Sequence, residues 1–255
     1  MPPRSSASRD AQAKRADRVD PELERRTLAA EDGHWWYQGR RAIVMDAARR
    51  VLAGEPRPAR ALDAGCGGGG VMAELATLAD VVGVEPAPES RGRALARGVG
   101  PVVDAKLERL PFADGEFDFA VSLDVLEHLP DERPGLAELR RVIRPGGALI
   151  ATVPAHPRMW SKHDDLNHHF RRYTRETMAA VAAAAGWRAS TMSHFNTMLL
   201  PFALAARRFD SGDGLSIPPA PVNAALRGIL QLERLALRSG LRLPVGLSLL
   251  VELRR

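Results

Sequence analysis

Short runs of hydrophobic residues alternate with helix-like patterns through the middle of the chain. Each run is bounded by Gly, Pro or Asp and is too short for a helix, which is typical of a buried strand. The segments between the runs repeat apolar residues at helical spacing and follow short turns. This alternation predicts an α/β fold with a parallel sheet and right-handed crossovers. The expected strands are 59–64, 80–85, 100–104, 117–123 and 148–153, and the expected helices end near 79 and 98 or cover 132–143.

The pattern changes towards both ends of the chain. Residues 1–27 hold few large apolar side chains, so they predict a frayed or disordered tail, with a helix from Pro21 to Ala30 as the alternative. The remainder, 28–255, is expected to form one domain. Its outer elements are a helix over 36–53, a helix from Thr174 to Ala185, a strand over 187–195, an apolar segment over 197–209 broken by Pro201, a linker over 210–221, an amphipathic helix over 222–238 and a last strand over 247–253.

A glycine-rich turn stands where the first strand should meet its helix. Residues 61–70 read Ala-Leu-Asp-Ala-Gly-Cys-Gly-Gly-Gly-Gly, and Glu85 closes the next apolar run. Glycines let backbone amides approach a ligand, and a carboxylate at the tip of the second strand can accept hydrogen bonds from a ribose diol. The turn also fits the dinucleotide pattern G-x-G-x-x-G, but Asp63 would repel a pyrophosphate and suits a cationic amino-acid group.

The run from Leu62 to Gly67 resembles the first motif of the class I S-adenosylmethionine (SAM)-dependent methyltransferases. Further motifs of that family follow in the same order, and two flanking stretches, His34–Arg41 and His168–Thr174, resemble a narrower subgroup that acts on small molecules. The resemblance implies a seven-stranded, mostly parallel Rossmann-like sheet with helices on both faces, a helical lid, and an antiparallel last strand inserted between its neighbours. The further motifs are Asp104-Ala105, Leu110–Phe112, Phe117–Val121, Asp124–His128 and Leu139–Gly147.

The same resemblance implies which residues bind SAM. The glycine turn would hold the methionine portion, Glu85 the ribose, and the segment around Asp104 the adenine. A solvated strand-end carboxylate is the alternative for Glu85, and a turn-forming Asp is the alternative for Asp104. A lid residue and an arginine (Arg40 or Arg41) would complete the site. The predicted cofactor-binding set is Asp63, Ala64, Gly65, Gly67, Glu85, Pro86, Asp104, Ala105, Leu123, Asp124, Trp36 and Arg41.

Histidines and charged residues after the fourth and fifth strands predict the acceptor site. His128 is the candidate general base, with Glu127 orienting it, although packing in the loop is an equal alternative. The segments 28–53, 155–173 and 197–241 are expected to cover the site, with a solvated surface loop as the alternative for the second. No metal ligand set is expected, because the histidine spacing is not a recognised zinc pattern and cysteine partners are absent. The predicted catalytic residues are His128, Glu127, His163 and His168, and the predicted substrate residues are His169, Arg172, Tyr173 and Asn196.

The charge and cysteine content of the chain bear on its expected partners and location. Lys and Arg number 36 against 31 Asp and Glu, a formal charge of +5, and lysine stands only at Lys14, Lys106 and Lys162. The surplus is spread along the chain, so nucleic acid is not expected as a partner. One cysteine forms no internal disulfide, and neither a signal core nor a long apolar span is visible, so we expect a cytoplasmic protein. Arginines flank the apolar stripe of 222–238, which predicts a lid, a homodimer interface or peripheral membrane contact.

The sequence therefore predicts a SAM-dependent methyltransferase that yields S-adenosylhomocysteine. The acceptor is expected to be an O or N nucleophile of a small or medium-sized metabolite: a natural product of secondary metabolism, a quinone, a lipid-linked molecule or a peptide amine. Both a monomer and a homodimer are compatible with the chain. Two alternatives remain at this stage: an NAD-dependent oxidoreductase, and a scaffold subunit that keeps the fold without catalysis.

Overall fold

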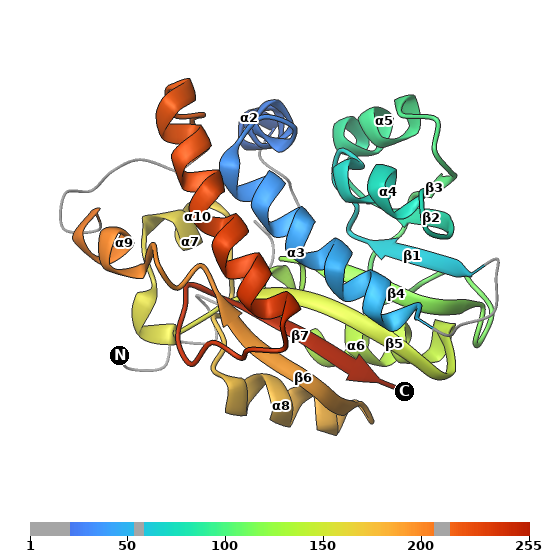
Figure 1. Ribbon diagram of the computed structural model, residues 1–255. Helices are drawn as coiled ribbons and strands as arrows, with labels where there is room; N and C mark the ends of the chain where they lie inside the picture. Colours follow the sequence, from blue (N-terminus) through green and yellow to red (C-terminus); the bar gives the residue numbers. More distant parts are fainter. Residues whose placement is uncertain (1–20, 54–58, 207–214) are drawn as a thin grey trace, which may run out of the picture.

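One sheet of seven strands organises the protein, in the order β3-β2-β1-β4-β5-β7-β6 (Figure 1). The computed structural model describes residues 21–53, 59–206 and 215–255. All neighbouring strands pair in parallel except β7, which runs antiparallel between β5 and β6. The predicted fold class is thus confirmed, including the inserted last strand. The strands are β1 (Arg60–Ala64), β2 (Asp80–Val84), β3 (Val102–Val103), β4 (Phe117–Leu123), β5 (Ile143–Pro154), β6 (Arg188–Phe195) and β7 (Ser248–Arg254).

Helices cover both faces of the sheet, and each face has its own hydrophobic core. One core packs α6 (Glu132–Val142) and α8 (Arg175–Ala184) against the sheet, and the other packs α3 (Trp35–Val51), α4 (Gly70–Leu75) and α10 (Ala220–Arg238) against the opposite face. Adjacent strand residues alternate between these cores, as the pleat of a strand requires: Leu149 belongs to the first and Ile150 to the second. Burial on both faces explains why the strands are nearly continuous hydrophobic runs.

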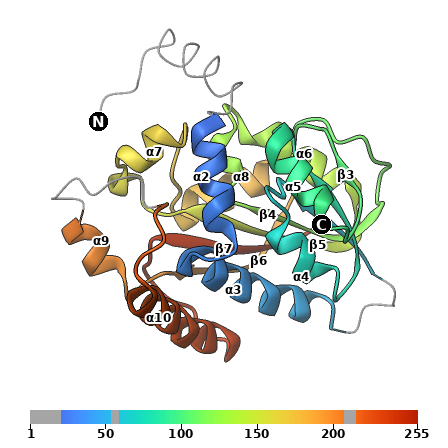
Figure 2. The ribbon, with the colours of Figure 1, turned by 90° about the horizontal axis from the view of Figure 1, so that it is seen from above.

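Helix α10 lies against α3, and Figures 1 and 2 show the two side by side. Gly39 permits the contact, because an added Cβ there would lie 2.3 Å from Leu230 Cδ1. Polar bonds fix the register: Arg234 Nε and Nη2 lie 2.7 and 2.9 Å from the carboxylate of Asp46. The predicted amphipathic helix is therefore part of the domain, to which it is joined by its contacts with α3.

Some elements differ from the predicted ones. Helix α2 (Pro21–Glu31) begins inside the segment 1–27 and matches the predicted alternative of a helix from Pro21 to Ala30. Its polar side chains bond to the rest of the domain, as Glu24 does to Ser90. Residues 1–20 lie outside the described part, as do residues 207–214, which hold the end of the predicted apolar segment and the start of the predicted linker. Strand β5 begins at Ile143 rather than 148. The loop after β5 contains a short helix, α7 (Lys162–Leu166), which the sequence pattern did not predict.

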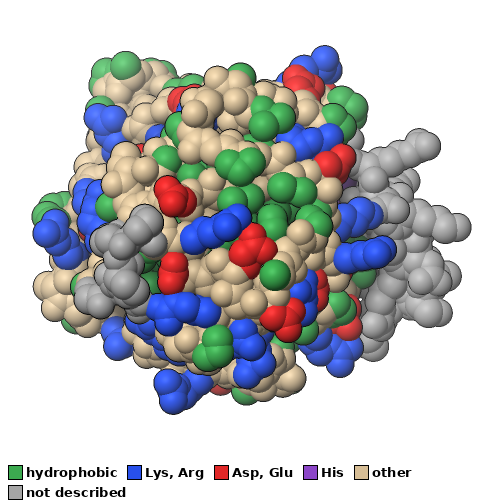
Figure 3. All heavy atoms as spheres, turned by 90° about the vertical axis from the view of Figure 1, so that its right-hand side faces the viewer, with side chains coloured by type: hydrophobic (Ala, Val, Ile, Leu, Met, Phe, Trp, Pro, Cys, Tyr) green, Lys and Arg blue, Asp and Glu red, His purple; other side chains and the backbone are tan. Residues whose placement is uncertain are grey.

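The remaining short elements are α5 (Pro88–Ala96), α9 (Leu200–Ala206) and two 3-10 turns, η1 (Leu126–His128) and η2 (Pro157–Met159). Within the described residues, no helix is long and apolar enough to cross a membrane. On the face seen in Figure 3, basic and acidic side chains are interspersed around a group of hydrophobic ones. The described residues of that face form no continuous basic patch of the kind that binds nucleic acid.

Candidate functional site

A cavity of about 1750 Å³ lies where the parallel strands end. Its walls are the loops that follow β1, β2, β3, β4 and β5, together with parts of α2, α3, α9 and α10. Parallel strands bring all their carboxyl ends to one edge of the sheet, so residues far apart in sequence meet there. The cavity is larger than the roughly 300–1,000 Å³ of an ordinary small-ligand pocket. It therefore has room for more than one small molecule.

The glycine turn forms one end of the cavity. Gly65, Gly67 and Gly69 all have positive φ, at 83°, 54° and 80°. Gly65 is the most restricted, because a Cβ there would lie 2.5 Å from Val125 Cγ2. The amides of Gly65 and Cys66 both donate to the carbonyl of Val84, at 2.8 and 3.0 Å, and tie the turn to the end of β2. Main-chain hydrogen bonds thus fix the turn, and at Gly65 there is no room for a side chain.

Glu85 follows β2 and is hydrogen-bonded to the same turn. Its Oε2 accepts from the amide of Gly67 at 2.9 Å, and its Oε1 accepts from the amide of Ala87 at 2.9 Å. Burial raises the pKa of Glu85, and these two amides oppose the rise. Each carboxylate oxygen has a second lone pair, so both can accept one further hydrogen bond from a ligand diol.

Asp63, at the end of β1, is the unsatisfied group at this end of the cavity. Its residue is 2% exposed, and its Oδ2 has no hydrogen-bond partner among the residues described. Burial and the nearby carboxylate of Glu31 raise the pKa of Asp63 to about 7. A buried carboxylate in this state is stabilised by a positively charged ligand group. The turn, Glu85 and Asp63 together therefore fit a ribose joined to a cationic amino acid.

Helix α2 supplies a residue that sequence analysis missed. Glu31 Oε1 accepts from the amide of Gly70 at 3.1 Å, and Arg97 Nη2 lies 3.0 Å from Glu31 Oε2. Arg97 Nε also bonds to the carbonyl of Gly68 at 2.6 Å. These bonds hold α2 across the glycine turn. No local pattern marks them, because they join segments far apart in the sequence.

The adjacent arginines Arg40 and Arg41 of α3 point to different partners. Arg40 lines the cavity and forms an ion pair with Asp124, whose Oδ1 also accepts from Thr152 Oγ1 at 3.0 Å. Arg41 instead turns to α4, where its Nε lies 2.8 Å from Glu74 Oε1, and it does not line the cavity. The prediction that Arg41 reaches the ligand is therefore wrong in this structure. The arginine next to it occupies that place.

Most of the other predicted cofactor residues line the cavity. Trp36 does so while stacking on Phe195, with ring centroids 5.5 Å apart and planes 1° apart. Asp104 lines it too, but its exposed carboxylate pairs with Arg91 at 3.0 Å. Ala64 is fully buried in the core beside the turn and does not line the cavity. The lining residues of this set are Trp36, Asp63, Gly65, Gly67, Glu85, Pro86, Asp104, Ala105, Leu123 and Asp124.

The predicted catalytic and substrate residues gather at the other end. His163, His168, Arg172 and Asn196 line the cavity there with Glu127, His128 and His169. Tyr173 does not: it is 2% exposed and packs in the hydrophobic core, because its main chain pairs with Pro154 and His156. Its predicted substrate role is therefore wrong in this structure.

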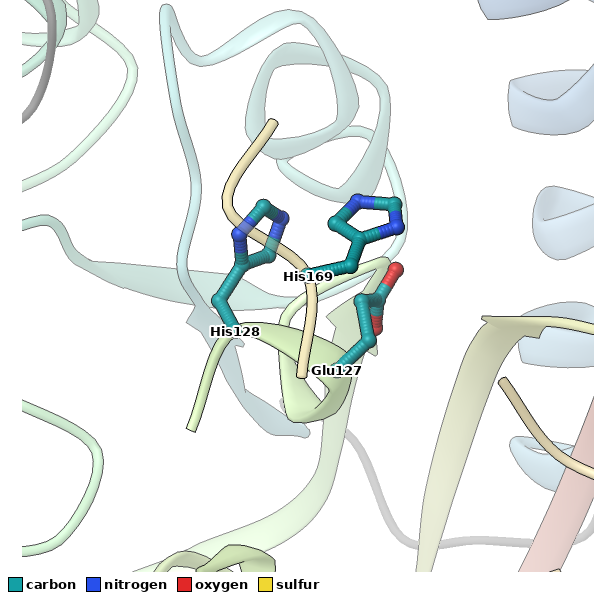
Figure 4. A group of neighbouring side chains, drawn as sticks. All are labelled: Glu127, His128 and His169. Carbon is teal, nitrogen blue, oxygen red and sulfur yellow. The ribbon is translucent and has the colours of Figure 1, made fainter. Parts of the chain in front are cut away.

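Glu127, His128 and His169 form a compact cluster within this end (Figure 4). One potential ligand atom from each lies within 4.8 Å of the other two. Glu127 is fully buried, and neither of its side-chain oxygens has a hydrogen-bond partner in the described part of the chain. Burial and the charge of Asp124 raise the pKa of Glu127, whereas burial and His169 lower the pKa of His128 to about 3. The His128 ring is therefore neutral at pH 7.

Asp164, on α7, is a second residue that sequence analysis missed. Its Oδ1 lies 3.0 Å from His169 Nδ1 and 2.7 Å from Arg172 Nε, and its Oδ2 accepts from the amide of Ser161 at 2.8 Å. Burial opposes ionisation, but these donors hold the pKa of Asp164 well below its usual range. The sequence showed Asp164 only as one of several polar loop residues, and the fold alone makes it the centre of the network.

The chain matches the family described as methyltransferase domain over residues 62–151. It is 32% identical over 188 residues to the malonyl-[acyl-carrier protein] O-methyltransferase of Pseudescherichia vulneris, which covers 70% of this chain and 74% of that protein. It is 33% identical over 133 residues to the ubiquinone biosynthesis O-methyltransferase of Rhizobium rhizogenes, covering 47% and 54%. Among solved structures, a putative methyltransferase of Haloferax volcanii in complex with a methyltransferase activator has a TM-score of 0.59 at 19% identity, covering 91% and 94%.

Proposed function

Because the chain belongs to the class I SAM-dependent methyltransferases, we propose that its acceptor is a medium-sized metabolite methylated on oxygen. The enzyme transfers a methyl group from SAM to a small molecule, as its relatives do. The single observation that carries the proposal is the cavity of about 1750 Å³, which continues from the glycine turn to the histidine-rich end. The first end fits the cofactor, so the second is left for the acceptor.

At the cofactor end, Asp63 and the amides of the glycine turn would hold the methionine portion, and Glu85 the ribose. The unpartnered Asp63 Oδ2 fits the cationic amino acid, and the two remaining lone pairs of Glu85 fit the diol. SAM supplies an already activated methyl group, so the protein's main tasks are orientation and the exclusion of water. Helix α2, tied to the turn through Glu31, would exclude water from this end.

At the acceptor end, polar and apolar walls face each other. His128, His163, His168 and Arg172 supply the polar groups, which suit a hydroxyl or a carboxyl group. The apolar wall suits a hydrocarbon body and consists of Leu199, Phe202, Leu215 and Leu226. Two of the relatives above are named O-methyltransferases, which supports oxygen over nitrogen. We propose His128 and Glu127 as the residues nearest to the reacting oxygen.

A lipid-linked acceptor at a membrane surface is the second candidate, and a specific observation favours it. Phe202 both lines the cavity and is 69% exposed, so the apolar wall continues to the protein surface. Leu232 and Leu235 of α10 are also exposed, at 57% and 59%, close to Arg238 in sequence. Cosedimentation with vesicles of anionic phospholipid tests this proposal. Phe202→Asp should weaken binding to the vesicles, and equal pelleting of this variant and the wild type would contradict the lipid-linked proposal.

A matched acceptor screen tests the main proposal. Pairs of compounds that share one apolar skeleton and differ only in bearing a phenol or an aniline are incubated with SAM and followed by mass spectrometry. We expect one methyl group added to the phenol of a pair and little to the aniline. Methylation of anilines alone would overturn the choice of oxygen. SAM binding without turnover across a wide panel would instead favour a non-catalytic scaffold. An NAD-dependent oxidoreductase is already disfavoured by family and by Asp63.

A further inference from the structure

The cluster of Glu127, His128 and His169 contains a buried carboxyl group that has no hydrogen-bond partner among the described residues. Glu127 carries two buried oxygens without partners in the described structure, at a position with 0% exposure. Burying a carboxyl group in this way is costly unless another group compensates it. The charges nearby do not pair with it: Arg40 is bound to Asp124, and Arg172 is bound to Asp164. A positively charged group bound beside Glu127 would offset the free energy that burial of its carboxylate costs.

We propose that Glu127, His128 and His169 bind a divalent cation of the Zn²⁺ type. Two imidazoles and one carboxylate are the protein ligands of many open zinc sites, which keep a further position for water or substrate. Imidazole ligands favour such borderline cations over Mg²⁺, which prefers oxygen. The sequence did not reveal the set, because His169 lies in a different loop from the other two residues (Figure 4).

The geometry around His169 supports this assignment. Its Nδ1 lies 3.0 Å from Asp164 Oδ1, and Asp164 is itself fixed by Arg172 and Ser161. A carboxylate that accepts from one ring nitrogen places the lone pair on the other, Nε2. Histidines that bind metals commonly have such a carboxylate behind them. Asp164 is therefore a positioning residue for the proposed site.

Aromatic packing alone accounts for the two histidine rings but not for the unbonded carboxyl group of Glu127. The rings of His128 and His169 form an edge-to-face pair with centroids 4.7 Å apart, which is an ordinary aromatic contact. That contact places two nitrogen-bearing rings beside Glu127, yet it gives the buried carboxyl group nothing to bond. Zn–N and Zn–O bonds of about 2.1 Å place the ligand atoms of a tetrahedral site about 3.4 Å apart. Atoms that lie up to 4.8 Å apart here would therefore have to approach by at most about 1.4 Å on binding.

The cluster lines the acceptor end of the cavity, so the open position of the cation would face the acceptor. There it would bind the acceptor's hydroxyl oxygen and lower the pKa of that hydroxyl. This last step rests on the proposed O-methylation, whereas cation binding itself does not.

Calorimetry on the full chain tests cation binding without any turnover. Protein treated with a chelator and then desalted is titrated with Zn²⁺, and Co²⁺ is added in parallel to read the coordination from its visible spectrum. We expect one cation per chain and a tetrahedral or five-coordinate Co²⁺ spectrum. Glu127→Gln should abolish the spectrum, and Asp164→Asn should weaken binding by about 10- to 100-fold and shift the Co²⁺ bands. His194→Gln changes a buried histidine outside the cluster and should bind as the wild type does.

Melting temperatures separate loss of the site from loss of the fold. Glu127→Gln keeps the shape of the side chain, so the chelated variant should melt close to the chelated wild type, and only the wild type should gain stability with Zn²⁺. Unchanged Zn²⁺ binding in Glu127→Gln, or no binding by a wild type that melts cooperatively, would overturn the proposal. SAM titration of the chelated protein tests the proposed function separately, since its failure leaves the Zn²⁺ result intact.

Discussion

Two buried glutamates, one at each end of the cavity, differ in their hydrogen bonds. Glu85, at the proposed cofactor end, has each oxygen bonded to a backbone amide, whereas Glu127, at the proposed acceptor end, has neither oxygen bonded within the described residues. Backbone amides in a fixed turn are in place before any ligand arrives. A buried carboxyl group without partners is compensated only when a ligand supplies a donor or a positive charge. The contrast indicates that Glu85 and the glycine turn are arranged before a ligand binds, whereas Glu127 gains its partner only from what the other end binds.

Gly65→Ala should break the cofactor end most strongly. The added Cβ would lie 2.5 Å from Val125 Cγ2, at a residue whose φ is 83°. The left-handed backbone and the overpacking together should cost roughly 2–5 kcal/mol, shared between stability and SAM affinity. Thermal unfolding and SAM calorimetry measure both. Gly92→Ala is the control, because nothing lies within 4 Å of that Cβ on α5 and the helix should gain stability.

The same substitution at both ends sharpens the comparison. Glu85→Gln removes the charge from bonds to Gly67, Ala87 and the ribose, and should weaken SAM binding by about 2 kcal/mol, or about 30-fold. Glu127→Gln should leave SAM affinity nearly unchanged while lowering turnover of the acceptor. Calorimetry and steady-state kinetics on the two variants give the result. Equal losses of SAM affinity would show that the two ends are not separable.

The pH dependence of SAM binding tests the role of Asp63. Its pKa in the unliganded protein is about 7, and a positively charged ligand favours the ionised carboxylate. SAM affinity should therefore be complete above pH 7 and fall by up to tenfold per unit below it. Asp63→Asn should bind more weakly and with a flat profile between pH 6 and 8. A wild-type profile that is equally flat would contradict the assignment.

The ion pair of Asp46 with Arg234 of α10 should show the smallest effect, because neither residue lines the cavity. Burial raises the pKa of Asp46, but Arg234 outweighs burial and lowers it. A lowered pKa means that the ion pair stabilises the folded state above the unfolded pKa, near 4, and loses this contribution as the pH falls through the folded value. Asp46→Asn should cost about 1 kcal/mol at pH 7 and almost nothing near pH 2, measured by urea unfolding. An equal cost at both values would show that the charge is not the cause.

The sequence predicted those parts of the fold and site that depend on local pattern. Strand positions, the glycine turn and Glu85 follow from hydrophobic runs and from residues at strand ends. The parts it missed depend on long-range bonds. The helix of α2 was predicted only as the alternative to a tail, because charged residues such as Glu24 and Glu31 gain partners from α5 and α4. Arg40 and Arg41 are chemically identical in sequence, and only the helix face separates the one near Asp124 from the one near Glu74. Asp164 had no distinguishing pattern at all.

The position of β7 between β5 and β6 has a consequence for biosynthesis. Strand β6 pairs in the sheet only with β7, yet β7 is translated after the whole of segment 196–247. At usual rates of translation this delay lasts several seconds, during which β6 has no strand partner. Its inward residues Ser193 and Phe195 are then exposed beside the nascent parallel sheet. The unpaired edge of β6 can then pair with another chain, and a chaperone that covers this edge would protect the chain during that interval.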